Sequence, residues 1–312
     1  MARVCVIGES LIDIVRSPYG DEEDHVGGSP ANVAVGLASL GVDVDFATTY
    51  GPDLPGERVA EFLGQHGVHA LASSLTDEPT SSAVAELDEA GTATYTFDLH
   101  WDLRPVVLPQ GIGHVHTGSI GAVLEPGREA VLTALRTAER DATVSYDPNV
   151  RPTIMGDPAR LRALVEQVVR LSDVVKASAE DVAVLYPGLP ESGVLARWNE
   201  AGAALAVVTR GAHGVAYRLA STGESAERPI LASTVVDTVG AGDSFMAGLL
   251  SGLLEAGLLG GSDARERLRT ATLDDVTPAV ERGLAASAVT VAHAGAYAPI
   301  LAEIDATGTV DG

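Results

Sequence analysis

The order of apolar and polar positions along the chain predicts strands and helices in alternation. Short runs rich in valine and isoleucine are followed by longer segments whose apolar residues recur at helical spacing. The expected strands are Arg3 to Gly8, Val42 to Thr48, Gly113 to Thr117, Ala142 to Tyr146, Val174 to Lys176 and Leu205 to Thr209. The expected helices include Pro30 to Leu40, Gly56 to His66 and Pro158 to Leu171. This alternation predicts an α/β fold with a doubly wound, mostly parallel sheet.

Two segments, residues 11–26 and 81–98, interrupt this alternation. In the second, apolar residues alternate at period two around the turn Asp88–Gly91, which predicts a β-hairpin. Strands inserted between βα units do not easily join a covered parallel sheet. We therefore expect both segments to form a small antiparallel sheet that acts as a lid over the carboxyl edge of the main sheet. No linker separates a second domain, so we expect residues 1–312 to form a single domain.

Composition narrows the possible partners. The 20 basic and 43 acidic residues give a formal charge of -23, which repels nucleic acid and anionic membranes. No window approaches the roughly 20 apolar residues of a membrane span, and the N-terminus has no long apolar leader. The one cysteine, Cys5, lies in an apolar run and forms no internal disulfide. We expect a soluble, unprocessed cytoplasmic protein.

The sharpest motif is a glycine-rich turn that opens directly into a helix. Gly240, Ala241 and Gly242 would present unpaired N–H groups at the positive end of the helix dipole, which makes an anion hole. The charge of Asp243 opposes a bound anion, so its carboxylate needs a task of its own. A catalytic base for a hydroxyl nucleophile is such a task. The alternative is an aspartate that only caps the helix.

A second glycine-rich run enters the first long helix. It reads Gly27-Gly28-Ser29-Pro30-Ala31-Asn32-Val33-Ala34. Gly27 and Gly28 would let a sugar approach the backbone, and the Asn32 amide can donate to and accept from neighbouring hydroxyls. The alternative is an ordinary loop before a proline at the helix start.

Taken together and in this order, the two runs resemble the signatures of the ribokinase-like (PfkB-type) carbohydrate kinases. The resemblance extends over nearly the whole chain and departs at Val239, where the family commonly has threonine. It implies the ribokinase-like fold, ATP and Mg²⁺ as cofactors, and transfer of the γ-phosphoryl group to a sugar hydroxyl. Asp243 would be the base, and Gly240 to Gly242 the anion hole.

The resemblance also implies roles for further residues. Asp13 would bind sugar hydroxyls, with Trp101 beside them after the hairpin. Residues 176–181 stand where the family has Asn-x-x-Glu near Mg²⁺ and phosphates, but here the motif reads Ser178 and Asp181. This places Lys176 on the nucleotide side. The expected metal ligands are Glu180 and Asp181, with Asp237 and the Val239 carbonyl for K⁺.

Two late segments are expected to bind the adenosine part of the nucleotide. Thr209, Gly211 and Gly214 resemble the family's nucleotide-binding turn, although a plain hairpin turn explains them equally well on local sequence. Ala285 and Ala288 belong to a small-residue helix, which leaves room for a flat base.

Other designs for phosphate or metal binding do not fit. Lys176 is the sole lysine and follows Val175, so there is neither a Walker-A loop nor a protein-kinase pattern, and no dinucleotide fingerprint follows the first strand. His114 and His116 lack a third zinc ligand.

The stretch Asp147 to Pro152 and the opening Gly8 to Asp13 resemble fructokinases, so fructose is the leading substrate. 2-Keto-3-deoxygluconate, ribose and nucleosides remain open, and so does a non-catalytic sugar or nucleotide sensor. An acidic sugar would want an arginine after the hairpin, where this chain offers only Arg104. An intact Asp243 argues against the sensor. The resemblance also implies a homodimer through the lid.

Overall fold

The computed structural model describes residues 2–88, 93–231 and 234–307. Within these ranges, nine strands form one large sheet. In spatial order the strands are β13 (Ser225–Arg228), β12 (Val215–Leu219), β11 (Leu205–Thr209), β10 (Val174–Ser178), β9 (Thr143–Asp147), β8 (Ile112–Gly118), β1 (Arg3–Ile7), β4 (Val44–Ala47) and β5 (Val68–Ala70). The pairs from β11 to β5 are parallel, while β12 and β13 add an antiparallel edge.

Helices cover both faces of this sheet, which confirms the doubly wound α/β fold. Successive residues of β1 point to opposite faces, so Val4 and Val6 join one apolar cluster and Cys5 and Ile7 join the other. The helices are α1 (Ser29–Ser39), α2 (Leu54–Gln65), α3 (Gly127–Ala138), α4 (Pro152–Met155), α5 (Pro158–Val169), α6 (Ala179–Leu185), α7 (Glu191–Ala201), α8 (Ala241–Glu255), α9 (Ser262–Thr270), α10 (Leu273–Thr290) and α11 (Leu301–Thr307). Buried residues of α1, α8 and α10 belong to the first cluster, and those of α3, α5 and α7 to the second.

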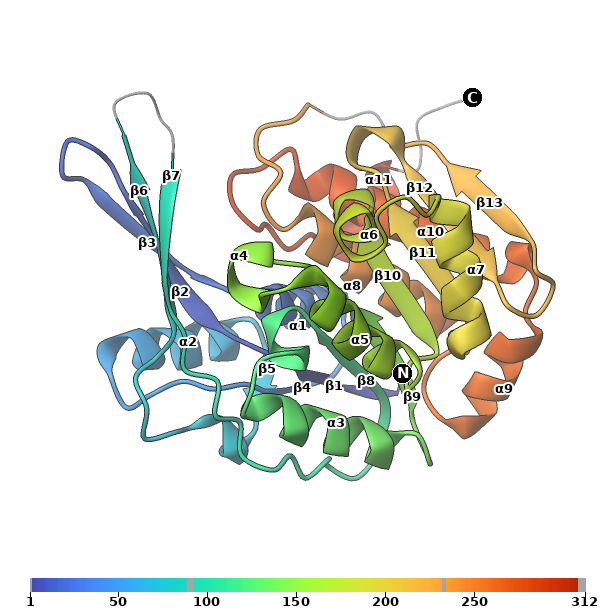
Figure 1. The fold of residues 1–312 in the computed structure, drawn as a ribbon, viewed down its shortest axis with the longest axis horizontal. Coiled ribbons are helices and arrows are strands. Elements are labelled where there is room, and N and C mark those ends of the chain that lie inside the picture. The colour runs from blue at the N-terminus through green and yellow to red at the C-terminus, as the bar shows by residue number, and fades with distance from the viewer. Residues whose placement is uncertain (1, 89–92, 232–233, 308–312) are drawn as a thin grey trace.

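The two interrupting segments form a separate four-stranded sheet, called here the small sheet. Its order is β3 (Glu22–Gly27), β2 (Leu11–Arg16), β6 (Ser82–Leu87) and β7 (Ala93–Asp98). The hairpin expected from residues 81–98 is present, residues 11–26 form a second antiparallel hairpin, and a parallel β2–β6 pair joins the two. Residues 89–92 of the expected turn lie outside the described ranges. Figure 1 shows the small sheet projecting from the main body.

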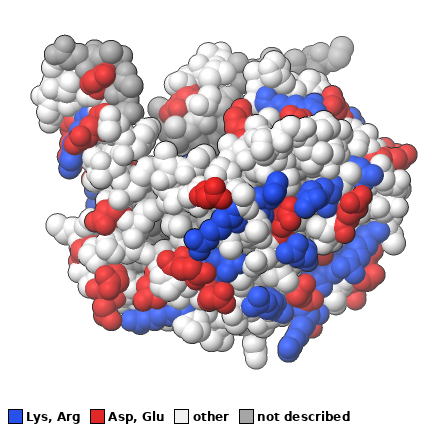
Figure 2. All heavy atoms as spheres, in the orientation of Figure 1, with Lys and Arg blue, Asp and Glu red and all other residues white. Residues whose placement is uncertain are grey.

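The surface of the main body carries both signs of charge. Figure 2 shows acidic and basic side chains interspersed over the visible face. No helix among the described residues is long and apolar enough to cross a membrane.

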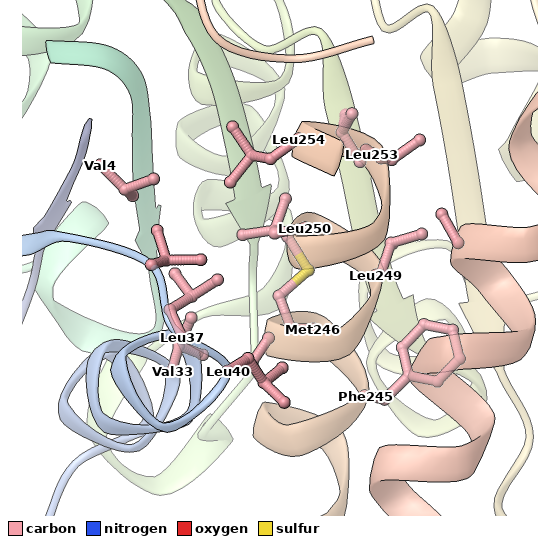
Figure 3. Packing of buried hydrophobic residues seen from close by; sticks show 14 of the residues in the cluster. Val4, Val33, Leu37, Leu40, Phe245, Met246, Leu249, Leu250, Leu253 and Leu254 are labelled. Atoms are coloured by element: carbon pink, nitrogen blue, oxygen red, sulfur yellow. The ribbon is translucent and has the colours of Figure 1, made fainter. Parts of the chain in front are cut away.

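Helix α8 lies at the centre of the first apolar cluster. Figure 3 shows Met246 and Leu250 of α8 near Val33, Leu37 and Leu40 of the α1 region. Small residues let α8 approach its neighbours closely. A Cβ on Gly36 of α1 would lie 2.8 Å from the Ala247 Cβ, and one on Gly252 would lie 2.7 Å from the Ala279 Cα of α10.

This packing predicts that Gly252→Ala destabilises the fold. The added methyl group cannot fit without moving α10, and such overpacking costs about 1–3 kcal/mol of unfolding free energy. Gly64→Ala in α2 is the matched control, because a Cβ there has no neighbour within 4 Å. That change should be neutral or stabilising by up to about 1 kcal/mol. Urea unfolding of both variants tests the difference, and equal stabilities would contradict the tight α8–α10 contact.

Candidate active site

The parallel strands bring the motifs to one edge of the large sheet. β1, β9, β10 and β11 all end there, and four of the motifs lie at or directly beyond their ends. The two glycine-rich runs follow β3 and β13 instead, but Pro30 lies against Gly8 and Gly242 against Lys176, which brings both runs to the same edge. Ligands bind at this carboxyl edge in open α/β sheets. Motifs from distant parts of the chain are therefore neighbours.

The start of α8 has the backbone expected of an anion hole. Gly240 precedes the helix with φ 75°, in the left-handed region that glycine adopts without strain. A Cβ on Gly240 would also lie 2.6 Å from the Ala296 Cβ. No side chain caps the first turn of α8, which leaves its first N–H groups without a side-chain partner. The Ala241 N–H, expected to be unpaired, donates to the Thr238 carbonyl at 3.3 Å.

The Asp243 carboxylate joins the starts of α8 and α1. Its Oδ1 accepts a hydrogen bond from the Ser29 hydroxyl at 2.7 Å, and its Oδ2 accepts one from Asn32 Nδ2 at 2.7 Å. The carboxylate makes no capping hydrogen bond to α8, so the helix-cap alternative does not describe it. Asn32, expected to contact a sugar, is bound to this carboxylate.

Burial raises the pKa of the Asp243 carboxyl above its ordinary value. The hydrogen bonds from Ser29 and Asn32 oppose that rise, as do the charges of Lys176 and Arg151. A higher pKa makes the carboxylate a better proton acceptor.

Asp13 is placed on the small sheet beside the start of α1. It pairs in register with His25 of β3, and its carboxylate lies against Gly27, where a Cβ would collide with it. Desolvation by surrounding protein raises the pKa of Asp13 to about 6, and His25 and Arg151 oppose the rise, although the residue itself is exposed. Gly28 has φ 107°, and a Cβ added to it would lie 2.6 Å from the Glu9 carbonyl oxygen, so only glycine fits at this position.

Trp101 is buried beneath this region and presents little surface to a ligand. Its indole N–H donates to the Gly121 carbonyl at 3.0 Å, and Glu9 accepts from the Gly121 N–H at 3.0 Å. Burial raises the pKa of Glu9 to about 7. Trp101 and Glu9 thus both hydrogen-bond the backbone of Gly121. In this structure Trp101 supports that loop, where a sugar contact was expected of it.

Residues 176–181 divide between an ion pair and a helix cap. Lys176 Nζ lies 2.8 Å from Asp147 Oδ2, with both side chains buried. Asp181 accepts from the N–H groups of Ser178 and Val150, so each of its oxygens already holds a backbone bond. Glu180 is exposed at the start of α6. Of the two expected metal ligands here, only Glu180 has its carboxylate open to solvent.

Asp237 and Val239 lie together next to the start of α8. The Asp237 carboxylate accepts from the N–H of Val239 at 3.1 Å and from that of Gly295 at 2.9 Å. These backbone bonds, led by Gly295, lower the pKa of Asp237. No group of three or more His, Cys, Asp or Glu side chains able to hold a metal occurs among the described residues.

The expected adenosine-side residues fall into two groups. Thr209 ends β11, and Gly211 and Gly214 have φ 51° and 85° in the turn to β12, so the turn is a true β-hairpin connection at the carboxyl edge. Ala285 and Ala288 of α10 are only 5% and 7% exposed. They leave little surface for an adenine base, so the prediction of nucleotide binding depends on the turn that contains Gly211 and Gly214.

Several residues at the site had no role in the sequence analysis. Ser29 precedes Asn32 by three residues, and that helical spacing on one face was the available signal. Arg151 acts on the pKa values of Glu9, Asp13 and Asp243, and His25 faces Asp13 across the strands. Arg104, the possible arginine substitute, instead pairs with the exposed Asp77 at 3.4 Å.

Known proteins share both sequence and fold with this chain. A fructokinase of Klebsiella pneumoniae is 34% identical over 268 residues, covering 82% of this chain and 86% of the relative. A double-mutant Vibrio cholerae fructokinase with fructose, ADP and potassium ion bound has a TM-score of 0.82 at 27% identity, over 98% of both chains. An ATP-bound fructokinase of Xylella fastidiosa shares the fold, with a TM-score of 0.84 at 23% identity over 98% of both chains. The pfkB family carbohydrate kinase model matches residues 1–303. The chain therefore belongs to the pfkB family of carbohydrate kinases.

Proposed function

We propose that this sugar kinase is an ATP-dependent fructokinase that converts D-fructose to fructose 6-phosphate. Its family makes it a sugar phosphotransferase. The observation that carries the mechanism is the Asp243 carboxylate, held by Ser29 and Asn32 at the open start of α8. Fructose is supported by the fructokinase relatives at about a third identity.

The proposed reaction is a direct transfer. Asp243 accepts the proton of the sugar hydroxyl, whose oxygen forms a bond to the γ-phosphorus while the bond from that phosphorus to the β–γ bridging oxygen breaks. ADP leaves with the bridging oxygen. The first turn of α8 stabilises the charge on the transferred group, because its N–H groups are fixed before the reaction begins.

Asp13 is proposed to orient the sugar through its hydroxyls, beside Gly27 and Gly28. A second substrate class is favoured by one observation. The charge of Arg151 acts on Asp13, so a cationic side chain is near the proposed sugar side and could pair with the carboxylate of 2-keto-3-deoxygluconate. The sugar panel below separates the two classes.

Two metal ions are proposed to act with the nucleotide. Mg²⁺ usually keeps several waters and binds through one or two carboxylates together with phosphates, which fits the single exposed Glu180. It would offset phosphate charge. For K⁺, the oxygens of Asp237 and the carbonyl of Val239 lie beside the start of α8, and faster turnover in K⁺ than in a large organic cation is the expected sign.

The small sheet is proposed to close over the sugar as a lid. Excluding water protects ATP from hydrolysis. The proposal is supported by Asp13 of this sheet, whose carboxylate lies against Gly27 just before α1. A cytoplasmic location is also proposed. It is supported by Cys5, which is a buried free thiol.

The activity prediction compares wild type with Asp243→Asn. ADP release with Mg-ATP should be fastest with D-fructose among fructose, ribose, glucose and 2-keto-3-deoxygluconate. Loss of the base should lower kcat about 10²- to 10⁴-fold, with little change in the binding of either substrate.

Asp157→Asn serves as the matched control, because Asp157 caps α5 and asparagine caps equally well. Its kcat should equal that of wild type. Retained turnover in Asp243→Asn would remove the base mechanism, and a folded wild type that binds sugar but phosphorylates none of the panel would favour the sensor.

The pH prediction concerns Ser29→Ala. Asp243 is active as the carboxylate, so activity is lost as the pH falls through its raised pKa. The Ser29 hydrogen bond favours the carboxylate, so removing it should move the acid limb of kcat/KM upward by about one pH unit. Ser39→Ala, at the other end of α1, should leave the profile unchanged. Identical profiles for all three proteins would contradict the contact.

A homodimer through the small sheet is the fourth prediction. Val15 and Tyr95 share one face of this sheet and are 37% and 61% exposed, and Tyr95 stacks on Phe97. An exposed apolar sheet face gains from being covered. Light scattering should give a dimer that Tyr95→Lys converts to monomer, with Tyr19→Lys in the neighbouring turn as control. A monomeric wild type at micromolar concentration would end this proposal.

A further inference from the structure

Glu9 is a buried carboxyl group that the proposed mechanism does not use. It lies two residues beyond the end of β1 and is 4% exposed. Burial raises its pKa from the ordinary value to about 7. Because folding raises this pKa, the buried acid lowers fold stability increasingly as the pH rises from the ordinary pKa of glutamate to about 7. Fold stability alone therefore does not account for an acid at this position.

Three segments of backbone meet closely around Glu9. They are residues 8–9 after β1, residues 28–30 at the start of α1 and residues 119–121 after β8. A Cβ on Gly28 would lie 2.6 Å from the Glu9 carbonyl oxygen, and one on Gly121 would lie 2.9 Å from the Gly8 Cα. A Cβ on Gly8 would collide with the Pro30 ring. The glycines permit these close approaches, but they have no side chains with which to hold the segments together.

The Glu9 side chain holds the turn after β8. Its Oε2 accepts a hydrogen bond from the Gly121 N–H at 3.0 Å, and the Ser119 side chain makes a second hydrogen bond to the carboxylate. Ser119 is buried with φ 53°, a conformation that residues other than glycine keep only where surrounding contacts impose it. Trp101 donates to the Gly121 carbonyl at 3.0 Å. Glu9 and Trp101 thus fix both polar groups of the same peptide unit's residue.

The turn after β8 is connected to the proposed base through α1. Residues 8–9 lie between this turn and the start of α1, so a shift of the turn would pass through them to Gly28. Ser29 and Asn32 in the first turn of α1 hold the Asp243 carboxylate. Glu9 is too buried to bind a substrate itself, but it lies where it can set the position of that first turn.

We propose that Glu9 is a positioning residue for the sugar side of the active site. It holds the turn after β8 against residues 8–9, and these residues keep the first turn of α1 where its contact with Asp243 requires it. The proposal deepens the proposed function and rests on it. The role depends on hydrogen bonds and not on charge, because a protonated carboxyl group can still accept from the Gly121 N–H and can donate to Ser119.

Steady-state kinetics separate this role from a general effect on the fold. Glu9→Leu removes both hydrogen bonds, so it should raise the KM for D-fructose about tenfold and lower kcat about tenfold. The KM for ATP should change less than about threefold, because α8 and the turn after β11 do not depend on Glu9. Glu9→Gln keeps an acceptor for Gly121 and a donor for Ser119, so its constants should stay within about threefold of wild type.

Asp45→Asn is the matched control for these variants. Asp45 is a second buried carboxyl group, and burial raises its pKa as well. It pairs with Arg3 at the start of β1, at 2.7 Å, away from the carboxyl edge of the sheet. Asp45→Asn should leave both KM values and kcat unchanged, whatever it does to the melting temperature.

Hydrogen exchange tests the geometry without turnover. In the unliganded protein, Glu9→Leu should speed exchange in the first turn of α1, where the Asn32 N–H donates to the Gly28 carbonyl at 2.9 Å. Exchange in the first turn of α8, where the Ser244 N–H donates to the Gly240 carbonyl at 2.8 Å, should stay as in wild type. Glu9→Gln should match wild type in both turns. Mass spectrometry of peptides from the two turns makes the comparison.

Three results would overturn the proposal. An equal loss of sugar and ATP affinity in Glu9→Leu would show that Glu9 only supports the fold, and unchanged exchange in α1 would show that the turn does not hold this helix. A Glu9→Gln variant as impaired as Glu9→Leu would show that the charge is what the site needs. Ser119→Ala removes one of the two bonds and should show the same selective change at smaller size, which keeps the test available if Glu9→Leu does not fold.

Failure of the proposed function would be seen separately. If wild type phosphorylated no sugar in the panel, the fructokinase assignment would fail. The exchange comparison between Glu9→Leu, Glu9→Gln and wild type would still decide whether Glu9 positions the start of α1.

Discussion

The site depends on one constraint, which is that the starts of α1 and α8 must meet closely enough to share a carboxylate. Asp243 accepts from Ser29 and Asn32, residues more than 200 positions away along the chain. This contact requires the helices to pack tightly, and Gly36 against Ala247 provides the space. The glycines of α8 that face α10 then set its position from the other side. The packing of α8 in the core therefore also determines the geometry of the site.

An acidic protein that binds nucleotide phosphates needs locally favourable charge. The formal charge is -23, yet the candidate site combines a helix start, Lys176 and Arg151. Fixed N–H groups and the buried Lys176 ammonium act over short distances in a medium of low polarity, whereas surface acids are screened by salt. A net negative charge at the surface, which repels polyanions, is thus compatible with a small anion held inside the site.

The sequence predicted the fold class well because hydrophobic periodicity and order decide it. The β6–β7 hairpin was also predictable, but the parallel β2–β6 pairing was not, since local alternation carries no information about which distant strands pair. Asp243 and its glycines stood out as a motif, whereas the bond from Asn32 to Asp243 depends on how two helices meet. The Lys176–Asp147 pair depends on the order of β9 and β10. Trp101 and Asp181 were given ligand roles by resemblance, but their burial and backbone bonds become evident only once neighbouring loops are placed.

The connection from the small sheet to α1 has a mechanical consequence. β3 ends at Gly27, Gly28 follows with φ 107°, and α1 begins at Ser29, so one residue separates the sheet from the helix that holds Asp243. With one glycine between them, a rotation of the small sheet would be passed directly to the start of α1, where Ser29 and Asn32 lie. If the small sheet closes as proposed, its rotation would therefore also shift the Ser29 and Asn32 hydrogen bonds that hold the Asp243 carboxylate.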